Sequence, residues 1–222
     1  MKEFLSKMAS VAPSNKFTFR CRQCGACCRH VKESVPLEPI DAFRLAKYLR
    51  DRGENVTCID DVLVKYAVPV LLHESGFTIF MLQTTGSDDA CIFLNGNHCT
   101  IHEVNPKACR TYPVSIGPDG HGSYEYFLSM EQPHHYTGPQ TTVKRWIHER
   151  CSQQDWNTWE TDFNSVAEIA CLLKQIPHDN LKRAMMLFLW YRYSNYDLDK
   201  SFIKQFKHNT RELVTELKKL VL

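Results

Sequence analysis

Apolar positions between residues 39 and 53 recur near helical spacing. The side chains that would share one helix face are Ile40, Phe43, Leu45, Ala46 and Leu49. Because proline favours the first turn of a helix and glycine the position after its end, Pro39 and Gly53 predict a helix over this range. A second helix is predicted to begin at Thr57, whose side chain would cap the first turn with Asp60 three residues on.

The pattern then changes to short strands joined by turns. Residues 68–73 and 77–83 surround a Glu-Ser-Gly turn, and the second run is β-branched and aromatic, which predicts a hairpin. Further along, residues 114–116 and 123–130 surround Pro118-Asp-Gly120, and these two runs are predicted to be additional strands.

A second hairpin is predicted between these two pairs. Residues 90–94 and 98–101 flank Asn95-Gly96, the dipeptide that best tolerates the positive φ of a tight hairpin turn. This turn would bring Cys91 and Cys99 together.

From Thr142 onward the chain is predicted to be almost entirely helical. The predicted helices cover residues 142–151, 155–175, 179–193 and 199–221, and the side chains assigned to their core are Trp146, Trp156, Trp159, Trp190, Leu213, Leu217, Leu220 and Val221. The fold class is therefore α+β: a small mixed α/β domain with short antiparallel hairpins over residues 1–140, followed by a C-terminal helical bundle over residues 141–222 that packs on it.

Composition narrows the class of protein. The 222 residues are 43% hydrophobic and 23% charged, which is typical of globular proteins and argues against a disordered chain. The formal net charge of +2 gives no electrostatic reason to expect a nucleic-acid partner. No uncharged apolar run approaches the ~20 residues that span a bilayer, so no membrane partner is expected.

The ten cysteines are the unusual feature of this composition. Residues 1–17 lack the apolar stretch of a signal peptide, which predicts a cytoplasmic location. Cysteines in that reducing compartment do not form a disulfide framework, so metal binding, catalysis or burial must explain them. Eight of the ten lie at or before Cys109, which makes the first domain the candidate for metal binding.

Four of these cysteines form the run Cys21-Arg-Gln-Cys24-Gly-Ala-Cys27-Cys28. Two-residue gaps allow a tight loop to direct successive sulfurs at one centre, and Gly25 permits the backbone to turn between them. Ionised thiolates about 4 Å apart would repel by about 4 kcal/mol per pair at an effective dielectric of 20, so a cation is required.

The last two residues of this run are predicted to have separate roles. Adjacent residues in extended backbone point to opposite faces, so Cys27 and Cys28 do not bind one ion with equal ease. The spacing Cys21, Cys24, Cys27 matches the first three positions of a bacterial ferredoxin run, whose fourth cysteine is absent here. A distant sulfur would therefore complete the site.

Candidates for that sulfur lie in the segment from Cys91 to Pro113, which contains Cys99, Cys109-Arg110 and Tyr112. The order C-x2-C-G-x-C-C, then C-x-F-L ahead of C-x-I-H-E-x2-P-x2-C-R-x-Y-P, resembles the YkgJ-like CxxCxxCC cysteine-cluster family, over about residues 17–130. The resemblance implies a zinc- or iron-chelating protein. A related motif set occurs in flagellin lysine N-methylases, which implies, as an alternative, an S-adenosylmethionine-dependent protein lysine N-methylase with an iron–sulfur cluster.

The chain departs from the family pattern after its last predicted strand. Where family members tend to carry Cys-Pro-Gly, this chain has Pro133-His134-His135 and no cysteine. An imidazole from His134 or His135, or the thiol of Cys151, could supply the missing ligand. The predicted metal ligands are Cys21, Cys24, Cys27, Cys28, Cys91, Cys99, Cys109, His134 and His135.

Eight donors would suffice for two tetrahedral zinc ions, or for a 4Fe-4S cluster with one mononuclear ion. The ferredoxin-like spacing favours iron–sulfur, and the separated cysteine pairs favour a structural zinc module that mediates protein interaction. Arg110 and Tyr112 are predicted to contact the bound cofactor, with core packing the alternative for Tyr112. Besides metal ions, a protein substrate or a redox partner is expected. Cys58 and Cys171 are predicted to pack as buried thiols.

Overall fold

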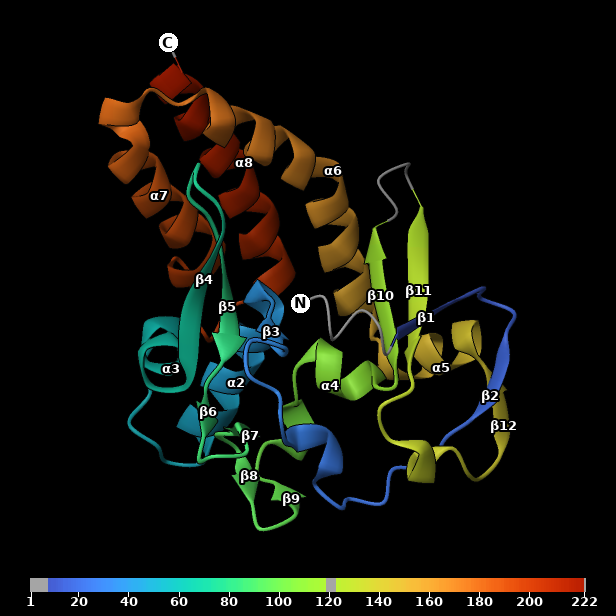
Figure 1. Cartoon of the computed structure of the whole chain (residues 1–222). Helices are drawn as coiled ribbons and strands as arrows, with labels where there is room; N and C mark the ends of the chain where they lie inside the picture. The colour runs from blue at the N-terminus through green and yellow to red at the C-terminus, as the bar shows by residue number, and fades with distance from the viewer. Residues whose placement is uncertain (1–7, 119–122, 222) are drawn as a thin grey trace.

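The α+β class is confirmed. The computed structural model describes residues 8–118 and 123–221, and Figure 1 shows short strand pairs below and beside a group of long helices. The described helices are α2 (Pro39–Asp51), α3 (Ile59–Tyr66), α4 (Lys107–Thr111), α5 (Val143–Arg150), α6 (Gln153–Gln175), α7 (Leu181–Leu189) and α8 (Phe202–Val221). Within the described ranges, no helix combines the length and the apolar character needed to cross a membrane.

The predicted helix over residues 39–53 is α2, with Pro39 in its first turn. The next helix begins two residues later than predicted. Cys58 is the N-cap of α3, and the carboxylate three residues on is that of Asp61, not Asp60. Asp61 Oδ2 accepts hydrogen bonds from the Thr57 and Cys58 backbone N–H groups, at 2.7 and 3.2 Å.

One antiparallel sheet has the strand order β3 (Pro36–Leu37), β5 (Phe77–Leu82), β4 (Ala67–His73). The β4–β5 pair is the hairpin predicted from residues 68–83. Apolar side chains of α2, α3 and this sheet form the largest core cluster, which Phe202 and Phe206 of α8 complete.

A second sheet has the order β1 (Met8–Val11), β11 (Tyr124–Ser129), β10 (Val114–Pro118). Its two later strands were predicted, but the edge strand β1 was not, because its short sequence has no distinctive period. The turn predicted at Pro118-Asp-Gly120 falls mainly on residues 119–122, which lie outside the described residues.

The described residues also form three two-stranded ladders: β2 (Lys16–Thr18) with β12 (Gln140–Thr142), β6 (Thr84–Thr85) with β7 (Ala90–Cys91), and β8 (Leu94–Asn95) with β9 (His98–Cys99). The hairpin predicted over residues 90–101 is therefore shorter than expected. Leu94 pairs with Cys99, so the turn is Gly96-Asn97, whereas Cys91 pairs with Thr84.

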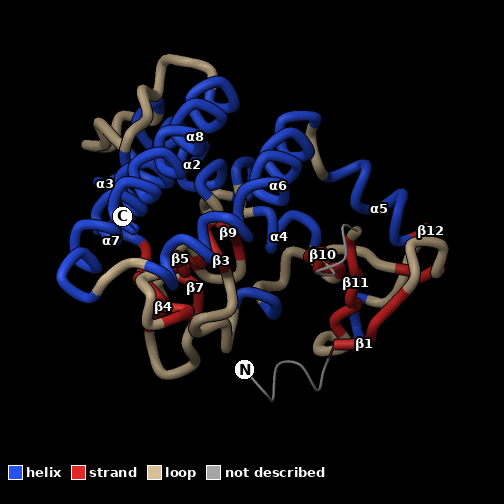
Figure 2. The backbone as a smooth tube through the Cα atoms, turned by 90° about the horizontal axis from the view of Figure 1, so that it is seen from above, coloured by secondary structure: helices blue, strands red, loops and turns tan. Residues whose placement is uncertain are grey.

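The helices after residue 142 agree with the predicted ranges, and α7 continues into a π-helical turn over Trp190–Ser194. Figure 2 shows α6 and α8 close to each other, and the core between α6, α7 and α8 contains Leu213, Leu217 and Leu220. Two core assignments were wrong. Trp190 is 50% exposed, and Cys171 lies on the exposed face of α6.

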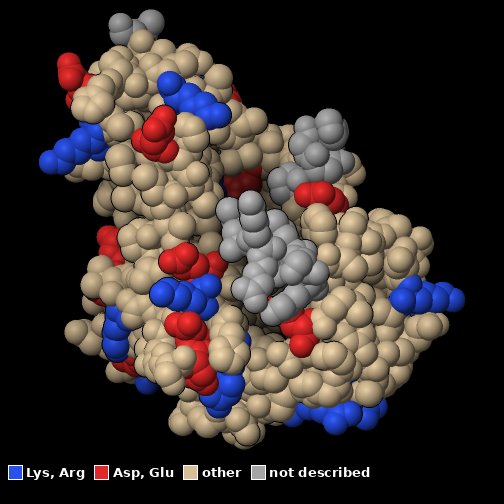
Figure 3. All heavy atoms as spheres, viewed as in Figure 1, with Lys and Arg blue, Asp and Glu red and all other residues tan. Residues whose placement is uncertain are grey.

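Acidic and basic side chains are mixed over the face shown in Figure 3, in agreement with the small net charge. This face has no single broad basic area among the described residues it shows.

Candidate metal centre

The first cysteine run is a loop that follows strand β2. Gly25 has a φ of +72°, and a short 3-10 helix over Ala26–Cys28 follows it. A left-handed conformation at Gly25 reverses the chain between Cys24 and Cys27 at no steric cost, because glycine has no Cβ.

This loop packs against the segment that carries the second cysteine block. A Cβ placed on Gly25 would lie 3.2 Å from Asn97 Cα and 3.2 Å from Leu94 Cδ1. The Arg29 guanidinium pairs with the Asp88 carboxylate and donates to the Gly96 carbonyl at 3.2 Å. Two cysteine blocks about 65 residues apart in the sequence are thereby held side by side.

Four thiols gather where the loop meets this segment, and we call Cys28, Cys91, Cys99 and Cys109 the four-thiol group. Cys91 is buried in the largest core cluster, and the other three pack against it. Burial raises the pKa of the Cys91 thiol to about 11 and also raises the pKa of the Cys109 thiol well above its ordinary value, and in each case neighbouring thiolates of the group add to the rise. The four thiols oppose one another's ionisation because they share one site. A bound cation would offset this repulsion and stabilise the thiolate forms.

The sulfurs of the four-thiol group lie farther apart than four sulfurs bound to one metal ion. Among the described residues, no three of these four sulfurs lie within 4.8 Å of one another. Tetrahedral zinc with bonds of about 2.3 Å would hold them about 3.8 Å apart. Cys27 lies beside the group, with its Sγ 4.0 Å from Cys28 Sγ.

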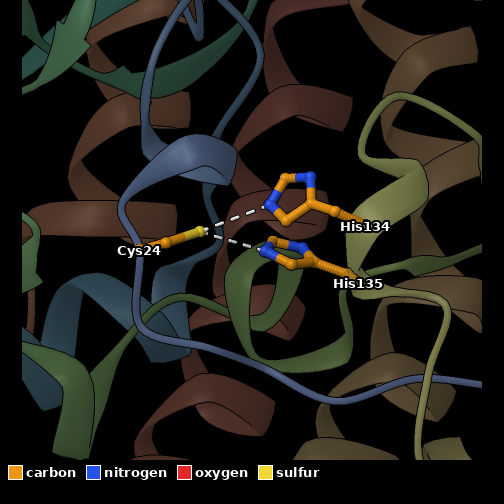
Figure 4. A group of neighbouring side chains, drawn as sticks. All are labelled: Cys24, His134 and His135. Atoms are coloured by element: carbon orange, nitrogen blue, oxygen red, sulfur yellow. Dashed lines mark hydrogen bonds between the residues drawn. The ribbon is translucent and has the colours of Figure 1, made fainter.

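A second group consists of Cys24, His134 and His135, and we call it the Cys-His group. Figure 4 shows both imidazoles directed at the same sulfur. The Cys24 Sγ lies 3.1 Å from His135 Nε2 and 3.5 Å from His134 Nε2. The three donor atoms all lie within 4.8 Å of one another. The histidines predicted to replace a family cysteine are thus adjacent to the first cysteine run.

Strand pairing explains why residues 111 positions apart meet. Strand β12 pairs antiparallel with β2, so the chain before β12 runs alongside the chain after β2. The Arg20 N–H donates to the His135 carbonyl at 2.9 Å, and the Phe19 ring packs edge-on against the His135 imidazole at 5.5 Å. His135 is only 1% exposed, whereas His134 is exposed.

A cleft of about 1110 Å³ borders both groups. Its lining includes all seven predicted cysteine ligands and His135: Cys21, Cys24, Cys27, Cys28, Cys91, Cys99, Cys109 and His135. Cys21 and Cys27 are exposed. Eight of the nine predicted donors thus line one solvent-accessible cleft, whereas His134 is not part of its lining, and Cys21 and Cys27 belong to neither group.

Arg110 contributes to this site through its protein contacts. Its Nε donates to the Arg150 carbonyl at 3.1 Å, its Nη1 to the Asn105 carbonyl at 2.9 Å, and its Nη2 to Asp155 Oδ1 at 3.0 Å. These bonds fix α4, which carries Cys109. Arg110 also lines the cleft, and its predicted contact with a cofactor stays a prediction.

Asp155 is the residue of this site that sequence reasoning missed. It lies at the third position of α6, where it forms a capping box with Ser152, and it also accepts a hydrogen bond from Arg44 Nη1 at 2.6 Å. Burial opposes its ionisation, but the hydrogen bonds from Arg44 and Ser152 outweigh burial and hold the pKa of Asp155 below its ordinary value. The Ser152-x-x-Asp155 spacing is typical of a helix start, but it gives no sign of the two arginines that converge there.

Tyr112 is half-buried and lines the cleft, with its ring edge-on to Phe19 at 5.7 Å. Burial raises its pKa, and the nearby Cys27 thiolate adds to the rise. Tyr112 therefore stays a neutral phenol at the cleft wall, and its contact with a cofactor stays a prediction.

The other three cysteines lie away from both groups. Cys151 is buried in a separate aromatic core with Phe17 and Trp146, where burial raises its pKa to about 12. Cys58 is half-buried as the N-cap of α3, a role its sequence context did not predict, and Cys171 is exposed. Of the two alternatives for the missing ligand, the histidine pair is the one beside the first cysteine run.

One comparison with known proteins supports metal binding by this chain. The sequence model of the CxxCxxCC family, described as a "Putative zinc- or iron-chelating domain", matches residues 20–152. This range is more than half of the chain and contains both groups. Comparison with curated proteins and with solved structures finds no match.

Proposed function

The chain belongs to the CxxCxxCC family, and from this premise we propose that it is a metal-binding protein whose four-thiol group holds an iron–sulfur cluster with a redox role. Cys28, Cys91, Cys99 and Cys109 would be the ligands, and thiolate is the donor that iron–sulfur clusters require. When bound, such a cluster supplies one-electron transfer. The fold brings the four cysteine-bearing segments together beside a cleft that is open to solvent.

The observation that carries this proposal is the spacing of the sulfurs. The four thiols oppose one another's ionisation, yet no three of them are within 4.8 Å. A cluster binds each cysteine through a different iron, so its ligand sulfurs lie farther apart than the four sulfurs around a single zinc ion. The wider spacing supports a cluster over mononuclear zinc at this group.

One contact supports zinc as the second candidate. The 4.0 Å between Cys27 Sγ and Cys28 Sγ is close to the about 3.8 Å expected for two thiolates on one zinc ion. In that case the site would be structural, and the bound ion would contribute folding free energy.

Anaerobic purification with metal and sulfide analysis tests the proposal. A 4Fe-4S protein should be brown, with about four iron and four acid-labile sulfide per chain. Cys109→Ser should lose the iron and stability together, whereas Cys171→Ala, which changes an exposed thiol, should keep the wild-type content. A colourless protein that contains zinc and no sulfide would favour the second candidate. Equal metal content in all three proteins would contradict the ligand assignment.

A further inference from the structure

The Cys-His group has the donor chemistry of a metal site in its own right. One thiolate and two imidazoles are ligands typical of borderline divalent ions such as zinc, cobalt(II) and iron(II). Iron–sulfur clusters, in contrast, are bound mainly by thiolates. Because its neighbours are two imidazoles and not thiols, Cys24 is suited to a different kind of centre from the four-thiol group.

The separations in this group fit one shared ion. With metal–sulfur bonds of about 2.3 Å and metal–nitrogen bonds of about 2.05 Å, tetrahedral angles place sulfur and nitrogen about 3.6 Å apart. The observed separations between Cys24 Sγ and the two Nε2 atoms are 3.1 and 3.5 Å. Both rings direct the same nitrogen at the sulfur, so one ion would meet all three donors without a change of rotamer (Figure 4).

We propose that Cys24, His134 and His135 form a second, mononuclear site for a borderline divalent metal, with a fourth coordination position open to the cleft. The inference rests on the proposed metal-binding function and adds a second metal site to it. Among the described residues, no further His, Cys, Asp or Glu donor lies within 4.8 Å of all three. Three protein ligands with one open position are typical of sites that bind an exogenous ligand, whereas structural zinc sites have four.

The surroundings of the histidines indicate that this metal exchanges readily. Metal-bound histidines usually donate their second N–H to an oxygen, and loss of that outer bond weakens metal binding about 10–100-fold. His135 Nδ1 is buried and has no hydrogen-bond partner among the described residues. His134 is exposed. A chelator should therefore remove the metal of the Cys-His group before it removes iron from the four-thiol group.

Cobalt(II) titration of the anaerobically purified protein, after brief chelation, tests the site. One equivalent should bind with the visible bands of four-coordinate cobalt and a thiolate-to-cobalt charge-transfer band, and the iron and sulfide content should not change. Azide, as a probe anion, should shift the visible bands by occupying the open position. Bands unaffected by saturating azide would overturn the open position.

The variant His134→Ala/His135→Ala should weaken cobalt binding at least ten-fold and keep the iron and sulfide content. The single variant His134→Ala changes an exposed side chain and should also weaken binding, which guards against misfolding of the double variant. The matched control is His98→Ala/His102→Ala, because these two exposed histidines line the same cleft. The control should bind cobalt as the wild type does.

Unchanged cobalt binding in His134→Ala/His135→Ala would show that the histidines only hydrogen-bond to Cys24. Joint loss of cobalt and iron in both histidine variants, but not in the control, would show one shared centre and overturn the separate site. A chain without iron or sulfide that still binds cobalt through the histidines would refute the iron–sulfur proposal and leave this site standing.

Discussion

Gly25 is a residue at which the first cysteine run packs directly against the second cysteine block. Gly25 has a φ of +72°, and an ideal Cβ placed on it would lie 3.2 Å from Asn97 Cα. Only glycine satisfies both of these constraints. One demand is local backbone conformation, and the other is space for the backbone of a distant segment. Both proposed metal sites depend on this turn, because Cys24 and Cys28 lie on either side of it.

We expect Gly25→Ala to lower both stability and metal content. The left-handed conformation would cost about 1–2 kcal/mol with a Cβ present, and the contact with Asn97 would push the loop away from the second cysteine block. Denaturant unfolding and metal analysis would measure the two effects.

Gly53→Ala is the matched control, because Gly53 has a φ of +83° and nothing within 4 Å of its ideal Cβ. It should show a similar loss of stability with metal content unchanged. Equal metal content in both variants would mean that the close approach at Gly25 is not needed for the site.

At the scale of elements, helix α4 is the short segment that delivers Cys109, and its neighbours hold it in place. Five residues cannot form a stable helix alone. The Arg110 bond to Asp155, and the bond of the Lys107 N–H to Asp41 Oδ2 at 3.1 Å, tie α4 to α6 and α2. The Trp146 indole N–H donates to the Thr111 carbonyl at 2.7 Å, which adds α5. Three longer helices thus fix the position of one proposed ligand, Cys109.

Asp155→Asn should destabilise the fold by about 3 kcal/mol and weaken metal retention, because it leaves two partly buried guanidinium groups without their carboxylate. The folded pKa of Asp155 is depressed. The stability that Asp155 contributes to the fold is therefore fully present above the ordinary carboxyl pKa of about 3.9. This stability is lost as the pH falls through the pKa of Asp155 in the folded protein. Wild type and variant should converge in acid. Urea unfolding at several pH values would measure this.

Asp162→Asn provides a control of similar chemistry, because Asp162 pairs with the buried Arg192 at 2.8 Å and lies on the same helix. It should lower stability without weakening metal retention. If both variants lose metal equally, the effect follows from general destabilisation and not from the position of α4.

At the scale of the whole molecule, the four-thiol group adjoins the largest core, to which Cys91 belongs. That core joins α2, α3 and the β3–β5–β4 sheet to Phe202 and Phe206 of α8. A bound metal would therefore stabilise parts of the chain far from its ligands, since ligand binding to the folded state adds to stability as a whole.

Metal removal under reducing conditions should lower the unfolding temperature of the long helices together with that of the sheets. Far-ultraviolet circular dichroism follows the helices, and fluorescence of Trp146 and Trp159, both buried, follows the region around α5 and α6. Coincident transitions at a lower temperature are expected. Helices that melt at the holoprotein temperature after complete metal removal would contradict this coupling.

The sequence alone determined the helices and the donor types, because both are local properties. Helical periodicity and Pro39 identified α2, and the two-residue gaps of the first cysteine run predict a thiolate site. The α+β class followed from the order of such segments. Strand β1 and the exposed positions of Cys171 and Trp190 were not predictable in this way, because they depend on what other elements cover.

Only the tertiary structure decided which of the candidate donors lie together. Strand β12 pairs with β2 and brings His134 and His135 to Cys24, whereas the contact of Gly25 with Asn97 brings Cys28 to the second cysteine block. Two cysteines of one run, Cys24 and Cys28, thus face different partners. The physical reason is that a ligand set is defined by distances between segments far apart in the chain, and those distances depend on strand pairing and core packing.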